Sequence, residues 1–311
     1  MVSVHVERSR RPAWSPSALT AIAGRGLGSV PPPALVLAGI VSVQVGAAIA
    51  KQLFGLTGAV GAVTLRLFFA ALVLLVVWRP SLRITRKELP VILGYGVVLA
   101  VMNLTFYQAL TRIPLGMAVT IEFLGPLAVS IIGARRWLHG LWALLAAIGV
   151  FALTEAGGGG IAITGVLFAL AAATCWGLYI PLGAALGART SGGRGLALAM
   201  AVGGLVSLPL GIADAGRTLF TPTALAAGFG VALLSSVLPY SVELEALRRI
   251  PPRVFGVLMS LEPAVAALVG LVVLGQSLRP AQWVAIACVV VASAGATRTQ
   301  GDTTTTPPPI D

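Results

Sequence analysis

Residues 109–126 read ALTRIPLGMAVTIEFLGP, and residues 246–263 read ALRRIPPRVFGVLMSLEP, so the chain contains an internal repeat at an offset of 137 residues. Seven of the 18 aligned positions are identical: Ala109/Ala246, Leu110/Leu247, Arg112/Arg249, Ile113/Ile250, Pro114/Pro251, Leu124/Leu261 and Pro126/Pro263. Two apolar helices often resemble each other by chance. A shared Arg-Ile-Pro turn and a shared proline within an apolar helix are much harder to obtain by chance, so the sequence indicates a duplicated unit.

The composition around this repeat is that of a membrane protein. Of the 311 residues, 57% are hydrophobic and only 10% are charged, whereas a soluble domain carries roughly 25% charged residues. Apolar stretches of about 20 residues, long enough to cross a bilayer, recur along the chain. The ten predicted spans are 34–54, 58–78, 90–110, 115–133, 137–154, 161–182, 195–213, 223–245, 254–274 and 280–297. The predicted fold class is therefore an all-α polytopic membrane protein with ten transmembrane helices.

The repeat divides these spans into two halves of five. Because five is an odd number, each half must cross the membrane in the opposite sense, which is the inverted-repeat architecture of many secondary transporters. The predicted organisation is a flexible basic N-terminal tail (1–33), a first repeat (34–154), a Gly-rich linker (155–160), a second repeat (161–297) and a disordered C-terminal tail (298–311).

The basic residues set the predicted orientation. The net charge is +11, but lysines and arginines lie between apolar spans instead of forming one patch, so nucleic acid is not a predicted partner. With the N-terminus inside, 16 of them fall in inside segments and 4 in outside segments. The positive-inside rule then places both termini in the cytoplasm of a protein that spans the bacterial inner membrane.

The chain lacks the motifs of several catalytic classes. It has no HExxH, Walker A or GxSxG motif and no paired histidines, and Cys175 and Cys288 have no metal-binding spacing. The sequence therefore predicts no enzyme, no cofactor and no metal site. The oligomeric state is left open.

Two acidic residues lie near the middle of predicted spans. A charge at the bilayer centre costs about 3 kcal/mol or more, so Glu122 and Glu262 each need a reason to be there. The repeat aligns Glu262 with position 125, three residues after Glu122, and residues three apart share a helix face. Both halves thus direct an acid to a comparable place, either a water-accessible cavity or a structural contact with a neighbouring helix.

A proline follows each acid. Pro126 and Pro263 each remove a helix hydrogen bond and release the carbonyl four residues earlier, so a kink could open a polar pocket at the acids. Ordinary kinking of a membrane helix is the alternative. Arg66, also deep in its span, is the predicted partner of a carboxylate from the protein or from a substrate.

Further polar residues complete the candidate site. Glu243 and Tyr240 lie on one predicted helix, and Asn103 is the repeat equivalent of Tyr240. Together they form a polar stripe that lines a path or makes hydrogen bonds between helices. Gln44 in the first span is a weaker candidate of the same kind.

Three segments resemble the EamA branch of the drug/metabolite transporter superfamily: GAAIAKQLF (46–54), PLGMAVTIEFLGPLAV (114–129) and LPYSVELEALRRIPPRVFGVLMSLEPAVAALVGLVVLGQ (238–276). Within it the likeness is greatest to the inner-membrane threonine/homoserine exporters and covers nearly all of 34–297. The resemblance implies ten helices, two EamA repeats and proton-linked efflux of small metabolites. Gln276 stands where family members usually carry an acid.

The predicted function is that of a secondary exporter of small amino acids such as threonine or homoserine, with protons as the coupling ion. The zwitterion's ammonium would meet Glu122 and Glu262, and its carboxylate would meet Arg66 or a helix N-terminus. One alternative is the export of drugs or lipophilic amines, and a second is a membrane scaffold or sensor that transports nothing. The scaffold hypothesis predicts that both acids pack against fixed partners with no cavity.

Overall fold

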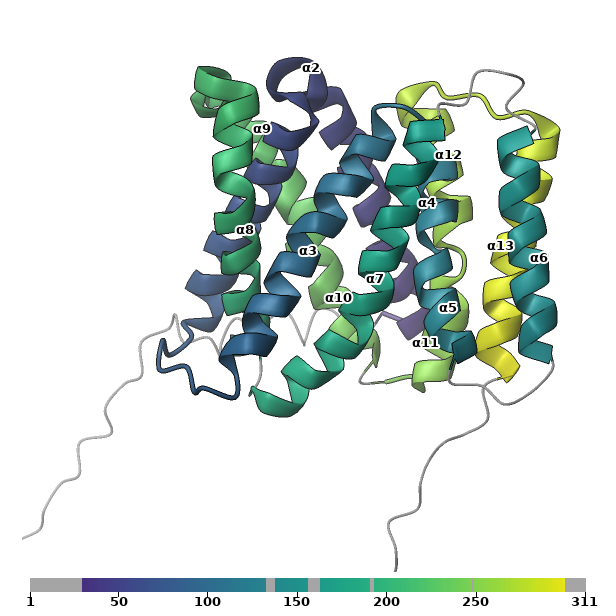
Figure 1. Ribbon diagram of the computed structural model, residues 1–311, viewed down its shortest axis with the longest axis horizontal. Coiled ribbons are helices and arrows are strands. Elements are labelled where there is room, and N and C mark those ends of the chain that lie inside the picture. The colour runs from purple at the N-terminus through teal and green to yellow at the C-terminus, as the bar shows by residue number, and fades with distance from the viewer. Residues whose placement is uncertain (1–29, 133–137, 156–162, 191–192, 248, 300–311) are drawn as a thin grey trace, which may run out of the picture.

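The computed structural model describes residues 30–132, 138–155, 163–190, 193–247 and 249–299, and every regular element in these ranges is helical. The elements are α2 (Pro32–Trp78), α3 (Leu89–Leu110), α4 (Leu115–Glu122), α5 (Leu124–Ile132), α6 (Leu138–Glu155), α7 (Ile163–Arg189), α8 (Arg194–Ala215), η1 (Gly216–Phe220), α9 (Pro222–Ala232), η2 (Leu233–Val237), α10 (Leu238–Leu247), α11 (Pro252–Met259), α12 (Glu262–Leu274) and α13 (Pro280–Thr299). Figure 1 shows them side by side in one bundle. The predicted all-α class is confirmed.

Within the described ranges, seven helices are long and apolar enough to cross a membrane, and two shorter apolar helices, Gly140–Ala152 and Pro222–Val237, accompany them. The predicted boundaries differ at the tails, since α2 begins at Pro32 and α13 continues to Thr299. Most of the predicted N-terminal tail, linker and C-terminal tail lies outside the described residues.

The 47-residue helix α2 contains a break at Gly58, whose backbone is not helical (φ 68°, ψ 172°). A side chain there would lie 2.5 Å from the Asp214 carboxylate, and positive φ strains any residue with a Cβ. Figure 1 shows the helix turning back on itself at this end of the bundle. The predicted spans 34–54 and 58–78 are therefore the two arms of α2.

The internal repeat is visible in the backbone. Helices α4 and α11 each have eight residues, each follows a proline with extended ψ, and their bounds differ by the same 137 residues as the sequences. Each ends four residues before a proline, Pro126 or Pro263. A proline has no N–H to bond the carbonyl four residues earlier, which explains why both helices are interrupted at this place.

The two repeated segments run in opposite directions. Figure 1 shows α4 above α5 but α12 above α11, and α4 packs against α12. The packing is close because Gly116 has no side chain, and a Cβ there would lie 2.7 Å from the Ala267 Cα. The acids at the two breaks are thereby brought to the interior of the bundle.

One end of the bundle is tied together by an ion pair. Arg194, the first residue of α8, contacts the Glu88 carboxylate at 2.7 Å and also donates to the carbonyls of Ser81 and Arg83. Glu88 in turn accepts from the Thr85 amide at 2.7 Å, and the Thr85 hydroxyl accepts from the Glu88 amide, which is a capping box at the start of α3. The loop between α2 and α3 is thus held against α8.

The ion pair makes the stability of the protein depend on pH. Hydrogen bonds from Arg194 and from the Thr85 amide lower the pKa of Glu88 to about 2, below its unfolded value of about 4.3. The stabilisation is therefore full above about pH 4.3 and is lost as the pH falls toward about 2. We expect Glu88→Gln to lower the melting temperature in detergent at pH 7, and the difference from wild type to narrow below about pH 4.3. A difference that stays constant down to pH 3 would show that the charge of Glu88 does not stabilise the fold.

Candidate functional site

A cavity of about 230 Å³ lies among the broken helices. Side chains from α2, α3, α4, α7, η2, α10, α11 and α12 form its wall: Val43, Gln44, Ala47, Arg66, Met102, Asn103, Phe106, Val119, Glu122, Trp176, Tyr179, Ser235, Pro239, Glu243, Met259 and Glu262. Helix interruptions concentrate here, since α4 ends at Glu122, α12 begins at Glu262 and η2 is a π-helical turn. Broken helices at membrane depth are tolerated where they line a cavity.

Three carboxylates face this cavity. Glu122 and Glu262 are only 8% and 7% exposed, and Glu243 is partly buried. Glu122 interacts electrostatically with Glu262, which interacts in turn with Glu243. The Glu262 carboxylate accepts a hydrogen bond of 3.0 Å from Gln44 Nε2 through its Oε1. The cavity therefore carries an excess of acidic groups.

Arg66 is held in place in the cavity wall by two hydrogen bonds. Its Nη1 donates to the Tyr107 hydroxyl and its Nη2 to the Ser235 carbonyl, both at 3.2 Å. Ser235 belongs to the π-helical turn η2, a rare conformation that is frequent at functional sites. The guanidinium also lies 5.7 Å from the centre of the Tyr107 ring and interacts electrostatically with Glu122. One fixed cation thus shares the cavity with the acids.

The structure brings most of the predicted residues together. Gln44, Arg66, Asn103, Glu122, Glu243 and Glu262 all line the cavity. Asn103 uses its Nδ2 to donate to the Leu99 carbonyl of its own helix at 2.9 Å. Pro126 and Pro263 are not in the wall, but each lies four residues after a wall residue, Glu122 or Met259. The side chain of Tyr240 lies outside the described residues.

The part of the cavity wall that α7 contributes was not among the site residues predicted from the sequence. Trp176 and Tyr179 line the cavity, and the Trp176 ring packs edge-on against Phe123 at the helix break, with ring centres 5.5 Å apart. The repeat itself holds a signal for other wall residues. The pairs Met102/Pro239, Phe106/Glu243 and Glu122/Met259, each 137 residues apart, all line the cavity.

Comparison with known proteins places the chain in a family. The EamA-like transporter family matches residues 163–298. The threonine/homoserine exporter RhtA of Escherichia coli (strain K12) is 40% identical over 271 residues, which is 86% of this chain and 92% of that protein. The protein of the same name from Salmonella typhimurium (strain LT2) is 39% identical over 271 residues, which is also 86% of this chain and 92% of that protein. This chain belongs to the EamA-like transporter family.

Membership in the EamA-like transporter family confirms both the resemblance and the exporter class predicted from the sequence. The fold agrees with a solved structure as well. The crystal structure of another protein matches with a TM-score of 0.56 and 20% identity, over 85% of this chain and 96% of that chain. The cavity described above is therefore a cavity inside a multi-pass membrane transporter.

Proposed function

We propose that this EamA-like transporter exports small neutral amino acids such as threonine and homoserine across the inner membrane in exchange for protons. The observation that carries the proposal is one cavity in which a fixed arginine faces an excess of buried carboxylates. An amino acid at neutral pH carries a carboxylate and an ammonium, so it needs a group of each sign. The exporters named for threonine and homoserine are 39–40% identical to this chain.

In this proposal Arg66 binds the carboxylate of the substrate. The carboxylates of Glu122 and Glu262 bind the ammonium group of the substrate and the coupled proton. Desolvation favours the neutral form of a buried acid, so an empty cavity favours a protonated acid and a bound ammonium favours an ionised one. Proton and substrate then compete for the same negative charge. This competition is the chemical basis of antiport, because the site releases one as it takes up the other.

The size of the cavity favours a small metabolite over a drug. Sites for drug-sized ligands have volumes of about 300–1,000 Å³, and this cavity has about 230 Å³. Its aromatic wall consists of Phe106, Trp176 and Tyr179. A membrane scaffold would pack its acids without a cavity, so the cavity also favours transport over the scaffold hypothesis.

The same proposal includes ten spans in two inverted halves. The two arms of α2 around Gly58 and the two shorter apolar helices would extend the seven long helices to ten. The antiparallel course of α4–α5 and α11–α12 (Figure 1) and the three wall pairs at the repeat offset support an axis in the membrane plane.

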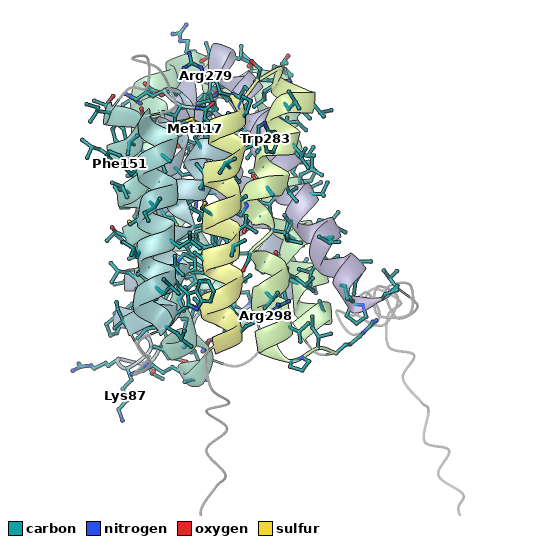
Figure 2. All side chains as sticks on the ribbon, turned by 90° about the vertical axis from the view of Figure 1, so that its right-hand side faces the viewer. Lys87, Met117, Phe151, Arg279, Trp283 and Arg298 are labelled. Atoms are coloured by element: carbon teal, nitrogen blue, oxygen red, sulfur yellow. The ribbon has the colours of Figure 1, made fainter. Side chains whose placement is uncertain are left out.

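We also propose that both termini are cytoplasmic. Figure 2 shows Lys87 and Arg298 at one end of the bundle and Arg279 at the other, in agreement with the sides assigned from the 16-to-4 distribution of basic residues. The end that carries Lys87 would face the cytoplasm.

Cysteine labelling tests this orientation. Arg83 and Thr218 are both exposed and lie in connections assigned to opposite sides. In a background without Cys175 and Cys288, Thr218→Cys should react with an impermeant thiol reagent added to intact cells. Arg83→Cys should react only after the cells are permeabilised. The reverse order of labelling would rule out the proposed orientation.

Transport by purified protein tests the function. Proteoliposomes that contain the full chain should exchange labelled threonine or homoserine across the membrane, and an imposed pH gradient should drive accumulation. Liposomes without protein are the control. If a panel of amino acids shows no exchange with or without the gradient, the proposed substrate class is wrong.

A further inference from the structure

Three buried oxygen atoms on side chains that line the cavity have no hydrogen-bond partner among the described residues: Gln44 Oε1, Ser235 Oγ and Glu262 Oε2. Two of them, Gln44 Oε1 and Glu262 Oε2, lie on side chains that are hydrogen-bonded to each other and are 2% and 7% exposed. Leaving a buried polar atom unsatisfied costs about 1–3 kcal/mol, and more for a charged group. Two such atoms on adjacent side chains that line a cavity indicate that something else supplies the missing donors.

These two unsatisfied oxygens, Gln44 Oε1 and Glu262 Oε2, belong to one hydrogen-bonded pair of side chains. Gln44 Nε2 donates to Glu262 Oε1 at 3.0 Å across 218 residues of sequence, so the remaining oxygen of each group flanks this bond. The orientation of the Gln44 amide follows from its partner, because a carboxylate oxygen accepts only from the NH₂ group. When Glu262 is ionised, both remaining oxygens are acceptors, and together they fit a ligand with at least two donors.

The charge around the pair defines the ligand further. The charged groups that line the cavity are Arg66, Glu122, Glu243 and Glu262, so acids outnumber the arginine. Arg66 is engaged with Tyr107 and with the Ser235 carbonyl, and no hydrogen bond joins it to Glu262 among the described contacts. A cationic group with several N–H donors fits the two free acceptors, whereas an anion or an ether does not.

We propose that Gln44 and Glu262 form a subsite for a primary ammonium group, with Gln44 Oε1 and Glu262 Oε2 each accepting one of its three N–H hydrogens. The subsite rests on the proposed amino-acid substrate and assigns the binding of its amine to this pair. Glu122 is not part of the subsite. Gln44 is the selecting residue, since it adds a second acceptor and fixes the rotamer of Glu262.

The local backbone positions Glu262 for this role. Helix α11 ends at Met259 and α12 begins at Glu262, so the carboxylate lies on the first residue after the break. The Ser260 hydroxyl lies at the break, where it donates to the Gly256 carbonyl at 3.0 Å and shares a hydrogen bond of 3.2 Å with the Ser293 hydroxyl. Gln44 comes from an uninterrupted part of α2, and its amide reaches this carboxylate at 3.0 Å.

Direct binding to the purified full chain in detergent tests the subsite, with ligand-induced thermal shifts as the readout. The ligands are L-threonine, L-threonine amide, which keeps the amine without a carboxylate, and 2,3-dihydroxybutanoate, which has a hydroxyl in place of the amine. The variants are Gln44→Met and the shape-conserving Glu262→Gln. Gln282→Leu is the matched control, because Gln282 is equally buried but donates to Met117 away from the cavity.

We expect both variants to bind threonine and its amide at least about 10-fold more weakly, as expected for losing a hydrogen bond to a charged group. Binding of 2,3-dihydroxybutanoate should change less than about 3-fold, and Gln282→Leu should bind all three ligands as wild type does. Equal loss for the amines and for the deaminated acid, or no loss for the amines, would overturn the subsite. If the amide binds through Gln44 but proteoliposomes do not transport threonine, the subsite stands and the proposed function falls.

Discussion

Proteoliposomes containing the Glu122→Gln/Glu262→Gln double variant are expected to exchange threonine at concentrations that offset its weaker binding, but to accumulate none when a pH gradient is imposed. A gradient of one pH unit supplies about 1.4 kcal/mol per proton, or about 10-fold accumulation for one proton per substrate. The double variant should reach a ratio of about 1. At least one of the two single variants should do the same, and the measurement is the internal concentration of labelled substrate at steady state.

The reason lies in the titration of the buried acids. Glutamine keeps the shape of glutamate but cannot bind or release a proton. Glu122 faces Arg66 and Glu262, and Glu262 faces Glu243 and Gln44, so an ionised acid here is stabilised only when a cation balances it. Glu88→Gln is the matched control, because Glu88 is outside the cavity and pairs with Arg194. Full gradient-driven accumulation by both single variants and the double variant would show that neither acid couples protons.

Replacing Gly125 with alanine should destabilise the protein strongly, whereas replacing Gly177 with alanine should not. The two glycines face each other where α5 crosses α7. A Cβ on Gly125 would overlap the Ala173 carbonyl, whereas the nearest atom to a Cβ on Gly177 is the Gly125 carbonyl oxygen at an ordinary 3.6 Å. Small residues permit this close approach of backbones in membranes. Overpacking typically costs about 1–3 kcal/mol.

Melting temperatures in detergent, with the yield of monodisperse protein, measure the difference. Gly125→Ala should melt several degrees below wild type or give little folded protein. Gly177→Ala should melt within about a degree of wild type, since it adds a methyl group at normal contact distance. Similar melting temperatures for the two variants would mean that α5 and α7 can separate without cost at this crossing.

Much of the fold follows from local features of the sequence. Hydropathy locates the apolar helices because each must satisfy its own backbone in lipid, and the helix breaks near Pro126 and Pro263 follow from the missing N–H of proline. The sequence predicts separate spans at 34–54 and 58–78, and the break in α2 lies at Gly58, where the backbone has positive φ. The tightness of this turn was not predicted, since it depends on the conformation of a single glycine.

The candidate site was less accessible to prediction because its contacts are distant in sequence. The acids and Arg66 were found because a charge in an apolar span is conspicuous. The bond between Gln44 and Glu262 joins opposite ends of the chain, and no spacing rule connects them. Trp176 and Tyr179 are ordinary residues for an apolar helix, so only the packing of α7 against the breaks shows that they form the cavity wall.

The coincidence of α4 and α11, which begin and end at equivalent positions, has a bearing on the ancestry of the protein. The two copies still share their interruption, yet the acid of one copy matches a methionine in the other, Glu122 with Met259, and Glu262 matches Gly125. A duplicated gene keeps what both copies need and lets the rest diverge. The helix break is thus common to both repeats, whereas the position of the acid beside it differs between them.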